Sequence, residues 1–206
     1  MNKPLFSRFF RIMIPCLLIL ILALPATASA GNLGDRITIG SSFAKGDYLT
    51  SQNGRFTAIW QNDGNFVVYQ NGSALWSSRT NNSGAISFKF EPTGKLVMYK
   101  YLSRPTTVYQ YGYHYGFNPA TGKYEYYYGW GYDTVWITDT TKLQDAWFTD
   151  TASWISKNGR GLPTNTTGDT LIMQNDGNLV LYNSTLTTIN YPNSWIPVWA
   201  SNTTGR

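Results

Sequence analysis

A segment of nine residues occurs twice in this chain and constrains its fold more than any other feature. Gln61–Tyr69 reads QNDGNFVVY and Gln174–Tyr182 reads QNDGNLVLY, so the copies differ only at two apolar positions. Such a match within 206 residues indicates an internal repeat. We therefore expect one structural unit to be built more than once.

The repeated segment predicts a β-hairpin. Residues 57–61 and 65–69 are rich in the β-branched and aromatic residues that favour short strands. The Asn-Asp-Gly sequence at 62–64 favours a tight turn with its glycine in the left-handed region. Alternation along the outgoing strand then places the polar residues of the motif on one face and core residues on the other.

The polar face of this hairpin suits a neutral polyol. It carries Gln61, Asp63, Asn65 and Tyr69, with Val67 as a small apolar patch. Amides, a carboxylate and a phenol together donate to and accept from sugar hydroxyls. Each such hydrogen bond contributes only about 0.5–1.5 kcal/mol, so one shallow site should bind weakly, near a millimolar constant or roughly −4 kcal/mol. A polar hairpin edge without a ligand is the alternative that these residues leave equally open.

The pattern QxDxNxVxY resembles the mannose-binding signature of the bulb-type (monocot-type) lectins, the B-lectin domain family. Both copies match it at every fixed position, and residues 37–61 resemble the opening of the family. The resemblance implies an all-β fold, a β-prism II of three four-stranded antiparallel sheets with pseudo-threefold symmetry. It also implies that mannose is bound by two sets of residues: Gln61, Asp63, Asn65, Val67 and Tyr69, and Gln174, Asp176, Asn178, Val180 and Tyr182.

The start of the chain predicts a secretory signal peptide over residues 1–30. A basic beginning, an apolar run at 12–24 and an Ala-Ser-Ala site at 28–30 are typical of such leaders. We expect a single lectin domain at 31–206, secreted to the exterior or cell surface, with no stable membrane insertion after cleavage. An uncleaved anchor is the lesser alternative.

The composition of the remaining chain excludes several functions. The leader holds three of the 16 basic residues and none of the 11 acidic ones, so about +2 remains and no basic stripe predicts nucleic acid binding. The only cysteine, Cys16, lies in the leader. The only histidine, His114, is expected on an exposed strand without a partner for metal binding or catalysis. No carboxylate pair marks a hydrolase, so we predict no cofactor, no metal and no enzymatic activity.

A decayed copy of the repeat lies at 91–99. The turn glycine, the valine and the tyrosine of the motif persist, whereas Glu91, Thr93 and Lys95 replace its Gln, Asp and Asn. We interpret this unit as kept for folding with its sugar site lost, and an altered ligand is the alternative.

An apolar residue followed by tryptophan also recurs, at 75–76, 135–136 and 198–199. The resemblance implies that these tryptophans, Trp76, Trp136 and Trp199, pack in the prism centre. Trp147 is a rival for the second position.

Two insertions interrupt the spacing of the repeats, at about 101–133 and 141–162. In the first, aromatic residues alternate with glycine and polar residues on both sides of a turn at 118–122, which predicts a long hairpin with one aromatic face. This face could pack onto the prism or a second subunit, or serve as a sugar-stacking platform. The second insertion is expected to be a surface loop with one or two buried tryptophans.

Together these features predict a secreted, non-enzymatic lectin that binds mannose or mannose-containing glycans through two sites. Weak single sites favour avidity, either within the chain or through a homodimer. Two other classes remain open. One is a lectin-like bacteriocin or toxin that targets surface polysaccharide, and the other is a structural surface protein that assembles through the aromatic hairpin.

Overall fold

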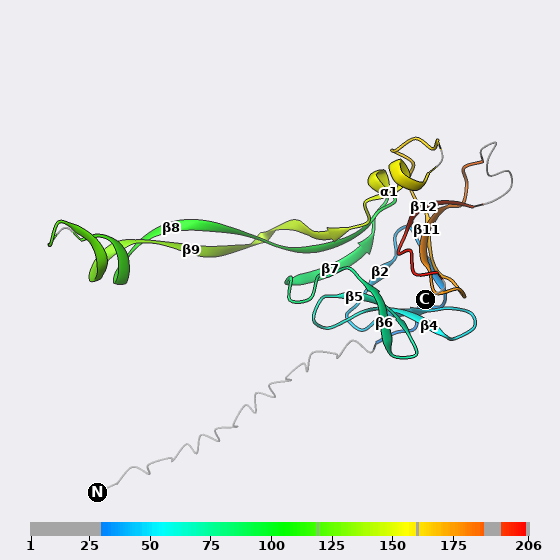
Figure 1. Cartoon of the computed structure of the whole chain (residues 1–206), viewed down its shortest axis with the longest axis horizontal. Coiled ribbons are helices and arrows are strands. Elements are labelled where there is room, and N and C mark those ends of the chain that lie inside the picture. Colours follow the sequence, from blue (N-terminus) through cyan, green and yellow to red (C-terminus); the bar gives the residue numbers. More distant parts are fainter. Residues whose placement is uncertain (1–29, 119, 160, 188–194, 205–206) are drawn as a thin grey trace, which may run out of the picture.

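Three antiparallel sheets of four strands each make up the body of the protein (Figure 1). The computed structural model describes residues 30–118, 120–159, 161–187 and 195–204. Apart from residue 30, the signal peptide predicted for 1–30 lies outside the described residues. The predicted all-β fold of three four-stranded antiparallel sheets is confirmed.

The strands of each sheet come from separated parts of the chain. The first sheet contains β3 (Tyr48–Thr50), β4 (Phe56–Trp60), β5 (Phe66–Gln70) and β6 (Ser73–Ser77). The second contains β2 (Ser42–Phe43), β7 (Ala85–Phe90), β8 (Leu96–Asn118) and β9 (Lys123–Phe148). The third contains β1 (Arg36–Thr38), β10 (Thr170–Met173), β11 (Leu179–Asn183) and β12 (Ile196–Ala200).

One copy of the repeated hairpin forms the two middle strands of every sheet: β4–β5, β7–β8 and β10–β11. The turn glycines Gly64, Gly94 and Gly177 have φ of 92°, 76° and 90°. A side chain is strained in this left-handed region, which is why each turn needs glycine. The predicted turn chemistry therefore holds in all three units, including the decayed one.

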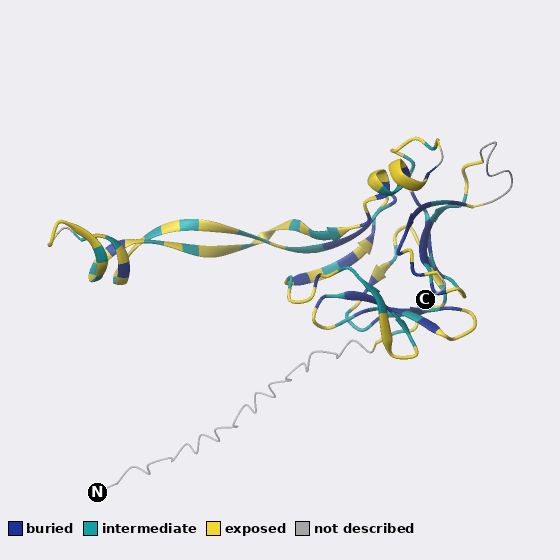
Figure 2. Ribbon diagram, in the orientation of Figure 1, coloured by how far each residue is buried: buried dark blue, intermediate teal, exposed yellow. Residues whose placement is uncertain are grey.

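The core lies between the three sheets, and its residues are almost fully buried. Figure 2 shows buried residues along the strands of all three sheets. Trp147 packs against this core and contacts Trp76 and Trp199, with ring centroids 6.0 and 6.1 Å apart. The central position predicted for Trp136 is wrong, because that residue continues β9 away from the prism and is 70 % exposed. Its rival Trp147 occupies the position instead.

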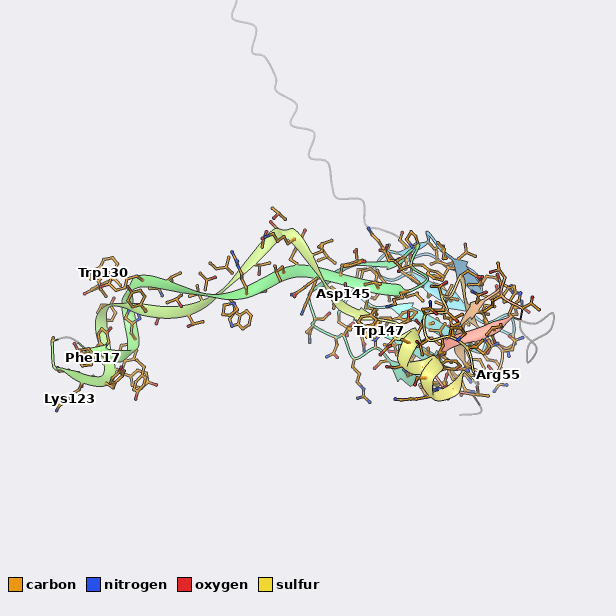
Figure 3. All side chains as sticks on the ribbon, turned by 90° about the horizontal axis from the view of Figure 1, so that it is seen from above. Arg55, Phe117, Lys123, Trp130, Asp145 and Trp147 are labelled. Atoms are coloured by element: carbon orange, nitrogen blue, oxygen red, sulfur yellow. The ribbon has the colours of Figure 1, made fainter. Side chains whose placement is uncertain are left out.

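Beyond the second sheet, β8 and β9 continue as a two-stranded ribbon that projects from the prism (Figure 1). Trp147 lies where this ribbon meets the prism, and Phe117 and Trp130 lie near its far end (Figure 3). The ribbon covers most of the first expected insertion, 101–133, but only the start of the second, 141–162, because β9 ends at Phe148. Residues 134–139 between the two insertions pair within the ribbon. A register shift after Tyr101 marks an irregularity in the ribbon.

The second insertion also contains a helix, α1 (Thr151–Asn158), where a loop was expected. The Asp150 side chain caps it by accepting a hydrogen bond from Ser153 N at 3.0 Å. Trp154 on this helix packs against the core and is partly buried, as is Trp147 before it. The one or two tryptophans expected to be buried here are therefore only partly buried.

Candidate functional site

The turn between β4 and β5 gathers the polar side chains of the first motif into a shallow group, which we call the Gln61 cup. Gln61 Nε2 donates a hydrogen bond to the Tyr69 phenol oxygen at 2.8 Å. At the tip of the turn, Asn65 N donates to Asp63 Oδ1 at 2.8 Å. The four side chains are exposed or partly exposed, so they meet at the surface.

The turn between β10 and β11 repeats this geometry in what we call the Gln174 cup. Gln174 Nε2 donates to the Tyr182 phenol oxygen at 2.7 Å, and Asn178 N donates to Asp176 Oδ1 at 3.0 Å. Burial raises the pKa of Tyr182, and the neighbouring Asp176 adds to this rise. The phenol is therefore neutral at physiological pH.

Residues behind the turn fix the asparagine of each cup. Asn65 Oδ1 accepts hydrogen bonds from Ser78 Oγ at 3.2 Å and from Thr80 N at 3.1 Å. In the Gln174 cup, Asn178 Oδ1 accepts from Ser201 Oγ at 3.1 Å and Thr203 N at 3.3 Å. Because the amide oxygen is occupied, the amide nitrogen is left to donate outward.

Sequence reasoning missed these supporting residues. The sequence signal for these residues is a Ser-x-Thr segment that begins two residues after Trp76 and after Trp199, at 78–80 and 201–203. The middle residues of the two segments, Arg79 and Asn202, have φ of 58° and 57°. The chain thus turns in the same way behind both cups.

These hydrogen bonds set the polarity of each cup. The phenol accepts from the glutamine, so its own O–H is left to donate. The aspartate uses Oδ1 for the turn, which leaves Oδ2 to accept. Thr204 Oγ1 lies 3.4 Å from Asp176 Oδ2, a weak contact at the edge of the Gln174 cup. Side-by-side donors and acceptors of this kind match adjacent hydroxyls of a saccharide.

Val67 and Val180, the apolar residues of the two motifs, are almost fully buried. Each is only 3 % exposed, on the same side of its strand as the asparagine and tyrosine of its motif. They can therefore present only a narrow apolar strip to a ligand, less than the sequence-based assignment of an apolar contact suggested.

The decayed unit at 91–99 keeps the shape of a cup and changes its polarity. Its residues follow the same order of exposed and buried positions as both cups. Here the Tyr99 phenol donates to Glu91 Oε1 at 3.2 Å, the reverse of the glutamine-to-tyrosine bond. Burial, followed by the hydrogen bond to Glu91, raises the pKa of Tyr99. Thr93 and Lys95 replace the aspartate and asparagine of the motif, so this unit has neither the carboxylate acceptor nor the side-chain amide donor of the two cups.

A lysine packs against the turn of the Gln61 cup. Lys45 Nζ lies 4.3 Å from the centre of the Trp60 ring and 3.4 Å from the Asn62 carbonyl oxygen. Burial lowers the pKa of Lys45, while Asp63 acts in the opposite direction. This cation lies beside the carboxylate of the cup and helps to hold the turn.

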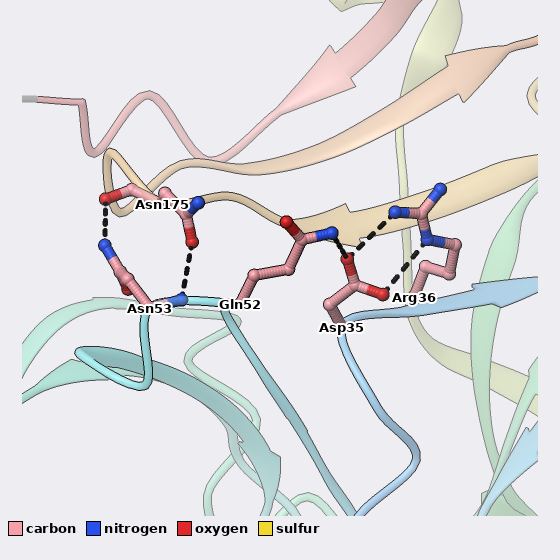
Figure 4. A network of polar contacts seen from close by, with 5 residues as sticks. All are labelled: Asp35, Arg36, Gln52, Asn53 and Asn175. Carbon is pink, nitrogen blue, oxygen red and sulfur yellow. Dashed lines mark hydrogen bonds and ion pairs between the residues drawn. The ribbon is translucent and has the colours of Figure 1, made fainter.

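The turn of the Gln174 cup is held from the first sheet instead (Figure 4). Asn53 N donates to Asn175 Oδ1 at 2.8 Å, and Asn53 Nδ2 donates to the Asn175 carbonyl at 2.9 Å. Next to this clamp, Asp35 accepts from Arg36 and from Gln52, at 2.9 and 2.8 Å from its Oδ2 atom. Asp35, Arg36, Gln52 and Asn175 border a hollow of about 200 Å³ that reaches Gln174.

His114 lies on the ribbon, far from both cups in sequence. Its side chain is 2 % exposed, so the expectation of an exposed strand position is wrong. Within the described ranges, no group of three or more His, Cys, Asp or Glu side chains is placed to hold a metal ion. A long apolar helix of membrane-spanning length is also absent from the part of the chain that the structure describes.

Comparison with known proteins gives a partial match in sequence. No family model matches the chain. Over 55 residues it is 47 % identical to the B-type lectin plumieribetin of Scorpaena plumieri, which covers 27 % of this chain. The matched segment spans about half the length of that relative, 48 %.

Solved structures with a related arrangement are lectins as well. A monomeric monocot mannose-binding lectin from Gastrodia elata is 23 % identical with a TM-score of 0.45, over 82 % of this chain and 98 % of its own. The mannose-specific agglutinin of snowdrop (Galanthus nivalis) is 17 % identical with a TM-score of 0.41, over 75 % and 94 %. The plumieribetin match confirms the predicted resemblance. Over the matched segment, the sequence of this chain resembles that of a B-type lectin.

Proposed function

We propose that the protein is a non-enzymatic lectin that binds mannose or mannose-containing glycans through the Gln61 cup and the Gln174 cup. One observation carries this proposal. Two of three equivalent hairpins hold the same glutamine–tyrosine bond and the same aspartate-capped turn, within 0.2 Å of each other. Folding alone does not need this polar set, because the unit at 91–99 folds without it.

Two cups in one chain also suit weak individual sites. A single cup is expected to bind mannose with a dissociation constant near the millimolar range. When both cups bind at once, the protein is retained more strongly on a dense glycan surface. The proposal therefore predicts modest affinity for free mannose and stronger retention on clustered mannose.

Exchanging the aspartates for asparagines tests the assignment most selectively. Asp63→Asn and Asp176→Asn keep an oxygen for the turn and replace the free acceptor atom with a donor. The double variant should lose retention on immobilised mannose, and each single variant should lose most of the avidity. Thr93→Asn, at the equivalent position of the decayed unit, is the matched control and should be retained as strongly as the wild type. Full retention of the double variant would refute the assignment.

The proposal includes export by the predicted signal peptide. Amino-terminal sequencing of protein recovered from the medium should begin near Gly31. A chain that begins at Met1 would contradict cleavage and leave the two cups unaffected.

A further inference from the structure

The far part of the ribbon carries one face made of aromatic rings, which we call the aromatic face. Its members pair across the two strands in five rungs. Each residue is between 53 % and 74 % exposed. They are Tyr109 with Tyr132, Tyr111 with Trp130, Tyr113 with Tyr128, Tyr115 with Tyr126 and Phe117 with Tyr124.

The rings are already ordered against one another. Neighbouring ring centroids lie 4.8–5.7 Å apart along the ribbon. Tyr113 and Tyr126 are stacked with 9° between their planes, and Tyr109 and Trp130 with 23°. Both stacked pairs lie diagonally across the two strands. In these pairs one face of each ring is covered by its neighbour, whereas other parts of the ring remain in contact with solvent.

The opposite face of the same segment holds its polar groups. His114 bonds Asp133 at 2.8 Å there, and Gln110 Nε2 donates to Asp133 Oδ2 at 2.8 Å. The five aromatic rungs hold no amide, carboxylate or ammonium group to orient sugar hydroxyls. Because stacked pairs also use their ring faces on each other, this surface does not offer a flat platform to a sugar.

A two-stranded ribbon is marginally stable unless a further layer covers its apolar face. Beyond Lys100 neither β8 nor β9 pairs with a third strand among the described residues. Ten rings exposed over more than half of their surface amount to roughly 1,000 Å². That exceeds the largest apolar patch of an ordinary monomer, about 300–600 Å², and reaches the approximately 800 Å² per partner that a stable interface buries.

We propose that the aromatic face binds the same face of a second copy of this chain. The rings of each ribbon would fill the gaps between rings of the other. A two-fold pairing lets one patch serve both partners. The cups lie on the prism, away from the projecting ribbon (Figure 1), so both copies keep them uncovered. This pairing does not depend on the proposed sugar binding.

Sedimentation equilibrium of the intact protein and of one triple variant tests the pairing. Tyr113→Thr, Tyr126→Thr and Tyr128→Thr together remove the middle rung and one ring of the next rung, and they keep good strand residues. Aromatic residues dominate interface energies, so the dissociation constant of the dimer should rise at least about a hundredfold. The matched control replaces two exposed apolar residues of the same ribbon outside the aromatic face, Ile137→Thr and Leu143→Thr, and should remain dimeric.

Three results would overturn the proposal. The wild type could remain monomeric up to about 100 μM, a concentration at which even a weak specific dimer forms, and this outcome does not depend on how any variant folds. The aromatic variant could dimerise like the wild type, which would indicate pairing through the free strand edges. The monomeric wild type could instead sediment with phosphatidylcholine vesicles, which would assign the face to a lipid surface. Retention on mannose is measured separately, so loss of pairing and loss of sugar binding are distinguishable.

Discussion

Ser78 and Asn65 lie thirteen residues apart in the chain, and the Ser78 hydroxyl donates to the Asn65 amide oxygen at 3.2 Å. The same hydroxyl accepts from Phe66 N at 2.9 Å. One side chain thus joins the β5 backbone to the amide that points into the Gln61 cup. Ser201 repeats both contacts, with Leu179 N and Asn178.

Replacement of Ser78 by alanine should weaken both stability and sugar binding. The buried Phe66 N–H loses its partner, at a cost of about 1–3 kcal/mol in the free energy of unfolding, and the freed amide should reduce affinity at the Gln61 cup about threefold to tenfold. Thr149→Ala is the control, because Thr149 Oγ1 accepts from Leu96 N at 3.1 Å in the decayed unit. It should lower the melting temperature similarly and leave mannose affinity unchanged. Equal loss of affinity in both variants would show that the effect is a general loss of stability.

The decayed unit offers a test by gain of function. Glu91→Gln, Thr93→Asp and Lys95→Asn together restore the polar residues of the motif on a turn that already has the right shape. The introduced glutamine would again donate to the Tyr99 phenol, and the introduced aspartate would accept from the backbone N–H of residue 95. Equilibrium dialysis with labelled methyl mannoside should show a third weak site. Unchanged stoichiometry in a folded variant would mean that the motif alone does not make a site.

Trp147 is expected to contribute strongly to stability. Trp147→Ala removes contacts with Trp76, Trp199 and Phe88, and should lower the free energy of unfolding by about 3 kcal/mol. Trp136→Ala, on the exposed ribbon, should change it by less than about 0.5 kcal/mol. Urea denaturation followed by circular dichroism measures both. Comparable losses would contradict the packing of Trp147 against the core.

The ribbon should respond to pH through one ion pair. His114 Nδ1 lies 2.8 Å from Asp133 Oδ1, and Nε2 lies 3.0 Å from the Gly129 carbonyl, so only the protonated ring can donate to both. The hydrogen bond to Asp133 raises the pKa of His114 above its usual 6.5, and the bond to His114 lowers the pKa of Asp133 below 3.8. The histidine contribution is complete below pH 6.5 and is lost as the pH rises through the raised pKa. The aspartate contribution is complete above pH 3.8 and is lost as the pH falls through the lowered pKa.

Ordering of the ribbon should therefore be greatest between pH 3.8 and 6.5. As the chain has one histidine, its Cε1–H resonance reports the titration without overlap. The midpoint should lie above 6.5 in the wild type and fall in Asp133→Asn, where the charge of the partner is removed. A wild-type midpoint at or below 6.5 would show that the pair does not form in solution.

Much of the fold and of the two cups could be predicted because the sequence patterns that determine them lie within a few neighbouring residues. A glycine after Asn-Asp determines the turn, and alternation along the strand determines which side chains share a face; both follow from the backbone. The position of Trp147 could not be predicted locally, since Val135-Trp136 matches the pattern equally well. The contact of Ser78 with Asn65 crosses between strands, and the helix at 151–158 depends on packing of Trp154 against the prism. The burial of His114 was missed because it depends on the neighbouring Tyr127 ring, 5.8 Å away, and on the bond to Asp133.

Titration of the isotopically labelled protein with methyl α-mannoside, followed by two-dimensional amide NMR, tests the two cups most directly. Because each cup should bind near the millimolar range, shifts should saturate at roughly tens of millimolar. The account predicts that the side-chain amides of Asn65 and Asn178 shift together with the backbone of their own turns, while the amides of 91–99 stay in place. Shifts confined to other parts of the molecule, or none at all, would contradict it.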